Sequence, residues 1–142
     1  MQAREDAEHR ITLAEEALVL ARHDLEFQRW PVCVNFSQQA VENAAKAPLA
    51  FLGPAPRTHS PSDQLTKALQ QGLFPDAMRA AVQRLAELNA SLGSDVHMRV
   101  VYGDEQARLT PRQLFGEADA RQALASAEEA VRLARQVLEA AG

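Results

Sequence analysis

The segment NFSQQAVENAAKA, residues 35–47, combines the periodicity of a helix with an unusual concentration of polar side chains. At the helical angle of 100° per residue, apolar positions in and beside this segment cover more than half of the circumference. The polar side chains share the remaining arc: Asn35, Gln38, Gln39, Glu42 and Lys46. An isolated four-helix bundle needs a narrower apolar face. We therefore expect this helix to contact more than two neighbouring helices, or a second subunit.

The polar arc has two interpretations. Gln38, Glu42 and Lys46 follow one another at intervals of four residues, and Glu before Lys at this spacing stabilises a helix by about 0.3–0.5 kcal/mol per pair. In the first interpretation the row is an ordinary solvated face, and in the second it forms one wall of a ligand site. Asn43 differs because it falls on the apolar seam, where a buried amide needs hydrogen-bond partners, and we expect it to specify packing.

The flanking sequence contains further helical seams, in which apolar residues recur at spacings of three and four. They are Ile11, Ala14, Leu18, Ala21 and Leu25; Met78, Val82, Leu85, Leu88 and Leu92; and Leu124, Ala127, Val131, Ala134 and Leu138. The second helix should begin near Pro31, kink at Pro48 and stop at Gly53. A short helix is expected over 62–71.

The predicted fold class is all-α, an up-and-down four-helix bundle with one extra short helix, forming a single domain over residues 1–142. The last long helix should start at Thr110 and Pro111, because Thr110 with Gln113 three residues later fits a capping box. This helix is expected to reach residue 140.

The connection SDVHMRVVYGDEQARL, residues 94–109, is too long for an ordinary bundle loop and suggests a function. Residues 96–102 are β-prone but have no partner strand, so we interpret them as loop or extended chain. Arg99 can bind a phosphate through two N–H groups, or form a salt bridge to Asp104 or Glu42. Tyr102 can stack on a base or anchor the loop.

The composition excludes several classes of function. The net charge of −4 and the pI of about 5.5 disfavour broad, charge-driven binding to nucleic acid or an anionic membrane. Cys33 is the single cysteine, which fits a reducing cytoplasm, and its place on an apolar seam suggests packing rather than nucleophilic chemistry. The charged start MQAREDAEHR lacks a signal-peptide core, and no apolar run approaches the ~20 residues that span a bilayer. We expect a cytoplasmic protein with no metal and no cofactor.

The string FSQQAVENAAKA, residues 36–47, resembles the second-helix signature of the HEPN domain family. That signature has Phe or Ala, a small polar residue, Gln-Gln, and then Ala-x-Glu-Lys-x-x-Lys-Ala. The matching residues are Gln38, Gln39, Ala40, Glu42, Lys46 and Ala47. This sequence departs from it at Asn43, where Lys is common, and at Pro48, where an aliphatic residue is usual.

Other segments are similar to HEPN elements in the same order. ALVLARHDLEFQRWPVCV, residues 17–34, looks like the first helix and the aromatic entry to the second. RTHSPSDQL, residues 57–65, is similar to the Thr-His-x-Leu loop, and RVVYGD, residues 99–104, to the Arg-x-Tyr-Pro-Asp element. TPRQLFGEADARQALASAEEAVRLAR, residues 110–135, resembles the last helix.

The resemblance implies a helical bundle that is usually a homodimer and is often associated with a minimal nucleotidyltransferase in a toxin–antitoxin pair. Some HEPN members bind nucleotides, and others cleave RNA with an Arg-x4–6-His motif. Counted from Arg99, the motif histidine would fall at Asp104, Glu105 or Gln106, and none of these is histidine. A literal match at Arg4 and His9 lies at the start of the chain, away from the expected position.

We therefore expect a catalytically silent HEPN-type protein that binds a nucleotide or phosphate, with a minimal nucleotidyltransferase as a possible partner and RNA binding left open. The expected ligand-binding residues are Arg99, Tyr102, Asp104, Gln38, Glu42 and Lys46. One alternative is a divergent, metal-independent ribonuclease that uses Arg99 with Asp104 or His97. A second alternative is a protein-interaction module without a ligand.

Overall fold

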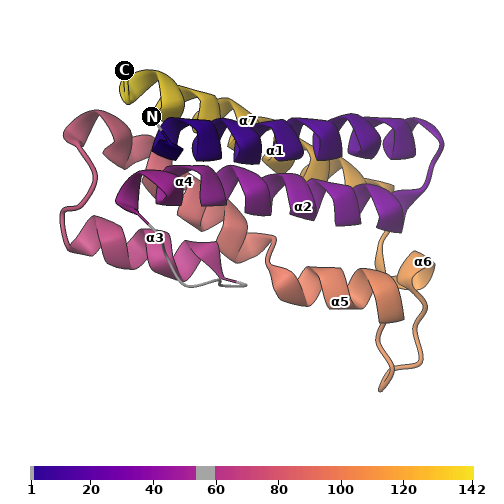
Figure 1. The fold of residues 1–142 in the computed structure, drawn as a ribbon. Coiled ribbons are helices and arrows are strands. Elements are labelled where there is room, and N and C mark those ends of the chain that lie inside the picture. The colour runs from indigo at the N-terminus through magenta and orange to yellow at the C-terminus, as the bar shows by residue number, and fades with distance from the viewer. Residues whose placement is uncertain (1, 54–59) are drawn as a thin grey trace.

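The computed structural model describes residues 2–53 and 60–142, and this part of the chain is predominantly helical (Figure 1). The long helices are α1 (Gln2–Glu26), α2 (Trp30–Leu49), α4 (Asp76–Ser91) and α7 (Glu117–Ala140). The shorter elements are the 3-10 turn η1 (Ala50–Leu52), α3 (Pro61–Gln70), α5 (Ser94–Tyr102) and α6 (Pro111–Leu114). The predicted all-α class is confirmed. Most of the loop expected over 53–62 lies outside the described residues.

Helix α2 is the centre of the fold. It packs against α1, α7 and α4, and also contacts α3 and α5. Its buried side chains extend around most of the helix: Pro31, Cys33, Val34, Ser37, Gln38, Ala40, Val41, Ala44, Ala45, Ala47, Pro48 and Leu49. The wide apolar face predicted from the sequence is thus explained by several neighbours within one chain.

The predicted seams form the core. Every residue of the α4 seam and of the α7 seam is buried, and so is the α1 seam apart from the partly buried Leu25. Fully burying a leucine or valine stabilises a fold by about 1.5–3 kcal/mol, so these seams supply the main driving force. Alanine is frequent in the interior of α1, α2 and α7, because small side chains allow helix backbones to approach closely.

The expectation of an irregular connection was wrong for residues 94–102, which form helix α5. Val96 and Val100 lie four positions apart on one helical face, and both pack against the core. Their burial outweighs the local β-propensity of valine and tyrosine. The helix ends at Gly103, whose φ of 68° is left-handed and whose N–H bonds to the Arg99 carbonyl.

Two helix ends also differ from the prediction. The capping box at Thr110 is present, with both the Gln113 N–H to Thr110 Oγ1 bond and its reciprocal, but it opens the four-residue α6. The chain is extended at Phe115, and α7 begins afresh where the Gly116 N–H donates to Asp119 Oδ2 at 2.9 Å. In α2 the α-helix ends at Leu49, one residue after Pro48, and η1 leads to Gly53 instead of a kinked helix.

Candidate functional site

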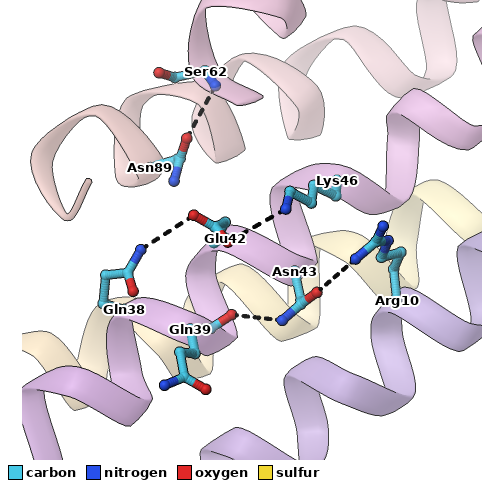
Figure 2. A network of polar contacts seen from close by, with 8 residues as sticks. All are labelled: Arg10, Gln38, Gln39, Glu42, Asn43, Lys46, Ser62 and Asn89. Carbon is cyan, nitrogen blue, oxygen red and sulfur yellow. Dashed lines mark hydrogen bonds and ion pairs between the residues drawn. The ribbon is translucent and has the colours of Figure 1, made fainter. Parts of the chain in front are cut away.

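The predicted row on α2 forms a continuous polar chain (Figure 2). Gln38 Nε2 donates to Glu42 Oε1 at 3.5 Å, and Lys46 Nζ pairs with Glu42 Oε2 at 3.4 Å. Gln38 is only 3% exposed, whereas the Glu42 and Lys46 side chains keep about a quarter of their surface in solvent. The carboxylate of Glu42 therefore connects a buried amide to an accessible ammonium group.

Asn43 faces a different neighbour. Its Oδ1 accepts from Arg10 Nη1 at 3.2 Å, and its Nδ2 donates to the Gln39 carbonyl at 3.1 Å (Figure 2). The amide is half-buried rather than fully buried, and its oxygen accepts the hydrogen bond from the guanidinium of Arg10 on α1. These contacts join α1 to α2 and agree with the packing role expected for Asn43.

The second group of predicted residues lies on α5 and the turn that follows it. Arg99 and Tyr102 are exposed, and within the described residues neither takes part in a hydrogen bond or an ion pair through its side chain. Asp104 is half-buried and its Oδ1 accepts from the Ala107 N–H at 3.0 Å. The guanidinium and the phenol are available to a ligand, while Asp104 already stabilises its own turn.

That turn is a tight hairpin. The backbones of Asp104 and Leu109 exchange two hydrogen bonds of 2.9 Å each. Arg108 takes a left-handed conformation, with φ of 57°, which lets the chain reverse within a few residues. A Cβ at Gly103 would collide with the Leu109 carbonyl oxygen, so only glycine fits at the base of the hairpin.

The helices that carry the two groups contact each other at Asn35 and His97, but the structure does not bring the two groups together. His97 Nδ1 on α5 lies 2.8 Å from Asn35 Oδ1 on α2, and Gln38 follows Asn35 by one helical turn. Helix α5 runs antiparallel to α2, alongside its N-terminal half (Figure 1). Arg99 and Tyr102 therefore continue away from Gln38, toward the start of α2. Lys46 lies eleven positions beyond Asn35, or roughly 16 Å along the helix axis.

A groove of about 440 Å³ lies elsewhere, between α3 and α4. It is lined by both polar and apolar side chains, among them Asp63, Leu69, Arg79 and Glu87. Arg79 Nη1 donates to the Leu69 carbonyl at 3.3 Å. None of the predicted ligand-binding residues lines this groove, and sequence patterns did not indicate it because its residues are scattered over two helices.

A buried polar cluster at the junction of α1 and α2 also escaped the sequence analysis. Asp24 is 5% exposed and pairs with Arg29 at 3.6 Å, and burial raises the pKa of its carboxyl despite that guanidinium. Cys33 is fully buried, and burial raises the pKa of its thiol. A thiol with a raised pKa is a poor nucleophile, which agrees with the packing role expected for Cys33.

The described residues hold neither a cluster of metal-ligating side chains nor a membrane-spanning helix. Residues 2–53 and 60–142 contain no group of three or more His, Cys, Asp or Glu side chains that could hold a metal ion. In the same part of the chain, no helix combines the length and the apolar character needed to cross a membrane.

The chain is similar to known proteins both in its sequence pattern and in its fold. The model of the HEPN domain family matches residues 7–141. The crystal structure of TT1696 from Thermus thermophilus is similar, with a TM-score of 0.68 and 19% sequence identity, over 96% of this chain and 99% of that one. At this identity the similarity concerns the fold alone. No curated protein shows a significant match.

Proposed function

Because the chain belongs to the HEPN domain family, we propose that it is a catalytically silent, dimeric member that binds a nucleotide or another phosphate-bearing ligand. We further propose that it works with a minimal nucleotidyltransferase in a toxin–antitoxin-like pair in the cytoplasm. The observation that carries the proposal is the pair of unengaged side chains on α5, Arg99 and Tyr102. They combine a phosphate-binding guanidinium with an aromatic ring three positions away.

The distances along α2 favour a long ligand. A free phosphate at Arg99 cannot also reach Lys46, since Lys46 lies roughly 16 Å beyond Asn35 in the opposite direction. A nucleotide has a base for Tyr102 and phosphates that extend from it. Arg99, Tyr102 and Asp104 then form the principal half of the proposed site, and Gln38, Glu42 and Lys46 form an extension of it.

The positions of His97 and Arg99 on α5 argue against the ribonuclease alternative. His97 and Arg99 are two positions apart, and residues at this spacing point to different sides of a helix. The Nδ1 of His97 is also engaged by Asn35. Asp104 is held by its own hairpin, where its Oδ1 accepts the hydrogen bond from the Ala107 N–H. A concerted acid–base pair with Arg99 therefore lacks support.

Calorimetric titration of the full chain with ATP and related nucleotides tests the ligand. We expect measurable heat with the wild type and a loss of about tenfold or more in affinity for Arg99→Ala, because charged hydrogen bonds to phosphate contribute strongly to binding. Arg132→Ala, an exposed arginine of α7, is the matched control and should bind as the wild type does. Absence of heat at millimolar nucleotide would contradict the proposal and favour an interaction module.

Incubation with RNA tests catalytic silence. We expect intact RNA with the wild type and with Arg99→Ala alike. Cleavage that disappears in Arg99→Ala would overturn the silent assignment and restore the divergent ribonuclease.

A further inference from the structure

The groove between α3 and α4, here named the α3–α4 groove, has a volume of about 440 Å³, which is within the usual range of small-molecule sites. Two hydrogen bonds mark its ends. The Ser62 N–H donates to Asn89 Oδ1 at 3.0 Å at one end (Figure 2). Arg79 Nη1 donates to the Leu69 carbonyl at 3.3 Å at the other. The groove therefore extends over seven positions of α3, or roughly 10 Å along the helix axis.

Small and polar side chains line the groove. Ser62 of α3 and Ala86 of α4 are 8% and 5% exposed, and neither side chain is long enough to fill the space above it. Leu69 adds an apolar surface to the lining. Thr66 and Gln83, midway between the two ends, offer a hydroxyl and an amide group. A ligand in the groove therefore meets apolar surface together with hydrogen-bonding groups, as in most small-molecule sites.

The groove is negative at the N-terminal end of α3, where Asp63 and Glu87 line it and are both exposed. In the described part of the chain Asp63 forms no ion pair, and its Oδ2 accepts a hydrogen bond from Ser60 Oγ at 3.0 Å. Glu87 shares Arg84 with Glu129, and the contact to Glu129 is the closer one, 2.8 Å against 3.4 Å. A cation bound at this end is attracted by both carboxylates.

Arg79 makes the opposite end of the groove positive. Its side chain is half-buried, and among the described residues it pairs with no carboxylate. The bond to the Leu69 carbonyl uses one of the five N–H donors of the guanidinium, so further donors remain for a ligand. A carboxylate is a suitable partner, because it can accept two parallel hydrogen bonds from a guanidinium.

Opposite charges at the two ends of the groove select a linear zwitterion. An ammonium group fits the acidic end, and a carboxylate fits Arg79. An extended peptide spans at most about 3.3–3.6 Å per residue, so about three residues cover roughly 10 Å. The amides of such a peptide can bond to Thr66 and Gln83 midway along the groove. A phosphate group is disfavoured at the acidic end, because the carboxylates there repel it.

We propose that the α3–α4 groove binds a short linear peptide with free ends, about three residues long, with its ammonium at Asp63 and Glu87 and its carboxylate on Arg79. Recognition of both ends selects for length, because a shorter peptide reaches only one end of the groove. This site is separate from the proposed nucleotide site and does not depend on it.

Calorimetric titration of the full chain with the tripeptide Ala-Leu-Ala tests the ligand. We expect measurable heat for the tripeptide with free ends. Acetylation of its amino end, or amidation of its carboxyl end, should lower the affinity about tenfold, since each removes one charged contact. The dipeptide Ala-Leu should also bind more weakly, because it cannot span the groove.

Variants of the two ends assign each contact. Arg79→Gln should weaken binding of the free tripeptide about tenfold but should not weaken binding of the amidated tripeptide further. Glu87→Gln should weaken binding of the free tripeptide and leave binding of the acetylated tripeptide unchanged. Arg132→Gln, which alters an exposed arginine of α7, is the control for the loss of one charge and should bind as the wild type does.

A bulky side chain in the groove tests the location. Ala90 is exposed and lines the groove, so Ala90→Phe should abolish binding of the tripeptide. Ala80→Phe is the matched control, because Ala80 is an exposed alanine of α4 outside the lining, and it should bind normally. Circular dichroism checks that every variant retains the wild-type helical content.

Three results would overturn this assignment. Absence of heat at millimolar free tripeptide shows that the groove binds no such peptide. Capped tripeptides or a dipeptide that bind as tightly as the free tripeptide show that the two ends are not recognised. Normal binding by Ala90→Phe places the peptide outside the groove. The nucleotide titration with Arg99→Ala reports on α5, so either proposal can fail without the other.

Discussion

His97 Nδ1 of α5 lies 2.8 Å from Asn35 Oδ1 of α2, and this contact sets the register between the two helices that carry the proposed site. The hydrogen bond joins residues 62 positions apart in the sequence. Gln38 lies one turn from this contact toward the C-terminus of α2, whereas Arg99 and Tyr102 lie from it toward the N-terminus of α2. The contact is exposed, so its effect is on position more than on overall stability.

We expect His97→Ala to loosen α5 from α2. Amide exchange of residues 96–102 should accelerate, while the free energy of unfolding falls by about 0.5–1.5 kcal/mol, as for one lost hydrogen bond. Asn35→Ala should act in the same way, and the double variant should be no worse than either single variant. The control is His23→Ala, an exposed histidine of α1. Strictly additive effects would show that the two residues are not coupled.

Gly103→Ala should destabilise the junction between α5 and the hairpin. The left-handed φ of 68° alone costs an L-residue about 1–2 kcal/mol, and the new Cβ would also collide with the Leu109 carbonyl oxygen. We expect a loss of about 2 kcal/mol or more in urea unfolding. Gly116→Ala is the control, since φ is −104° there and its Cβ would meet no atom within 4 Å; its effect should stay below about 1 kcal/mol.

Asp24 should make the protein less stable as the pH rises. Its pKa in the folded state is raised above the ordinary 3.8, so the folded chain binds the proton more tightly than the unfolded chain does. The stabilising contribution is then complete below about pH 3.8 and is lost as the pH climbs through the folded pKa. Asp24→Asn removes this titration and should gain stability relative to the wild type as the pH rises from about 3.5 to about 7.

Urea unfolding at several pH values measures this difference between Asp24→Asn and the wild type. The control is Glu26→Gln, which removes an exposed carboxylate at the same end of α1. The stability difference between Asp24→Asn and the wild type should vary more with pH than the difference measured for this control. An Asp24→Asn curve that runs parallel to the wild type would mean that Asp24 keeps its ordinary pKa.

Lys46→Ala distinguishes a long ligand from a short one. If a nucleotide extends along α2, the variant should weaken nucleoside triphosphate binding severalfold but leave binding of inorganic phosphate unchanged. Calorimetry with both ligands provides the measurement. Lys67→Ala, on the exposed face of α3, serves as the control for the loss of one positive charge. Equal weakening of both ligands would place the phosphate at Lys46 instead of Arg99.

The candidate site shows where sequence reasoning was sufficient and where it was not. The row Gln38, Glu42 and Lys46 was identified correctly as one helical face, because residues four apart on a helix are neighbours in any fold. The buried Asp24 was missed, since an acidic residue near the end of α1 is normally solvated. Its burial follows from how the chain packs at the junction of α1 and α2, which helical periodicity does not indicate.

The sequence by itself determined the family, the all-α class and the apolar seams of the long helices, because helical periodicity and turn residues act over a few positions of chain. Only the tertiary structure decided that residues 94–102 are helical, since burial of Val96 and Val100 against the core overrides their local preference for strand. It also decided where Arg99 and Tyr102 lie relative to Lys46. That arrangement follows from how α5 docks on α2 through His97 and Asn35, a contact between segments that no local pattern connects.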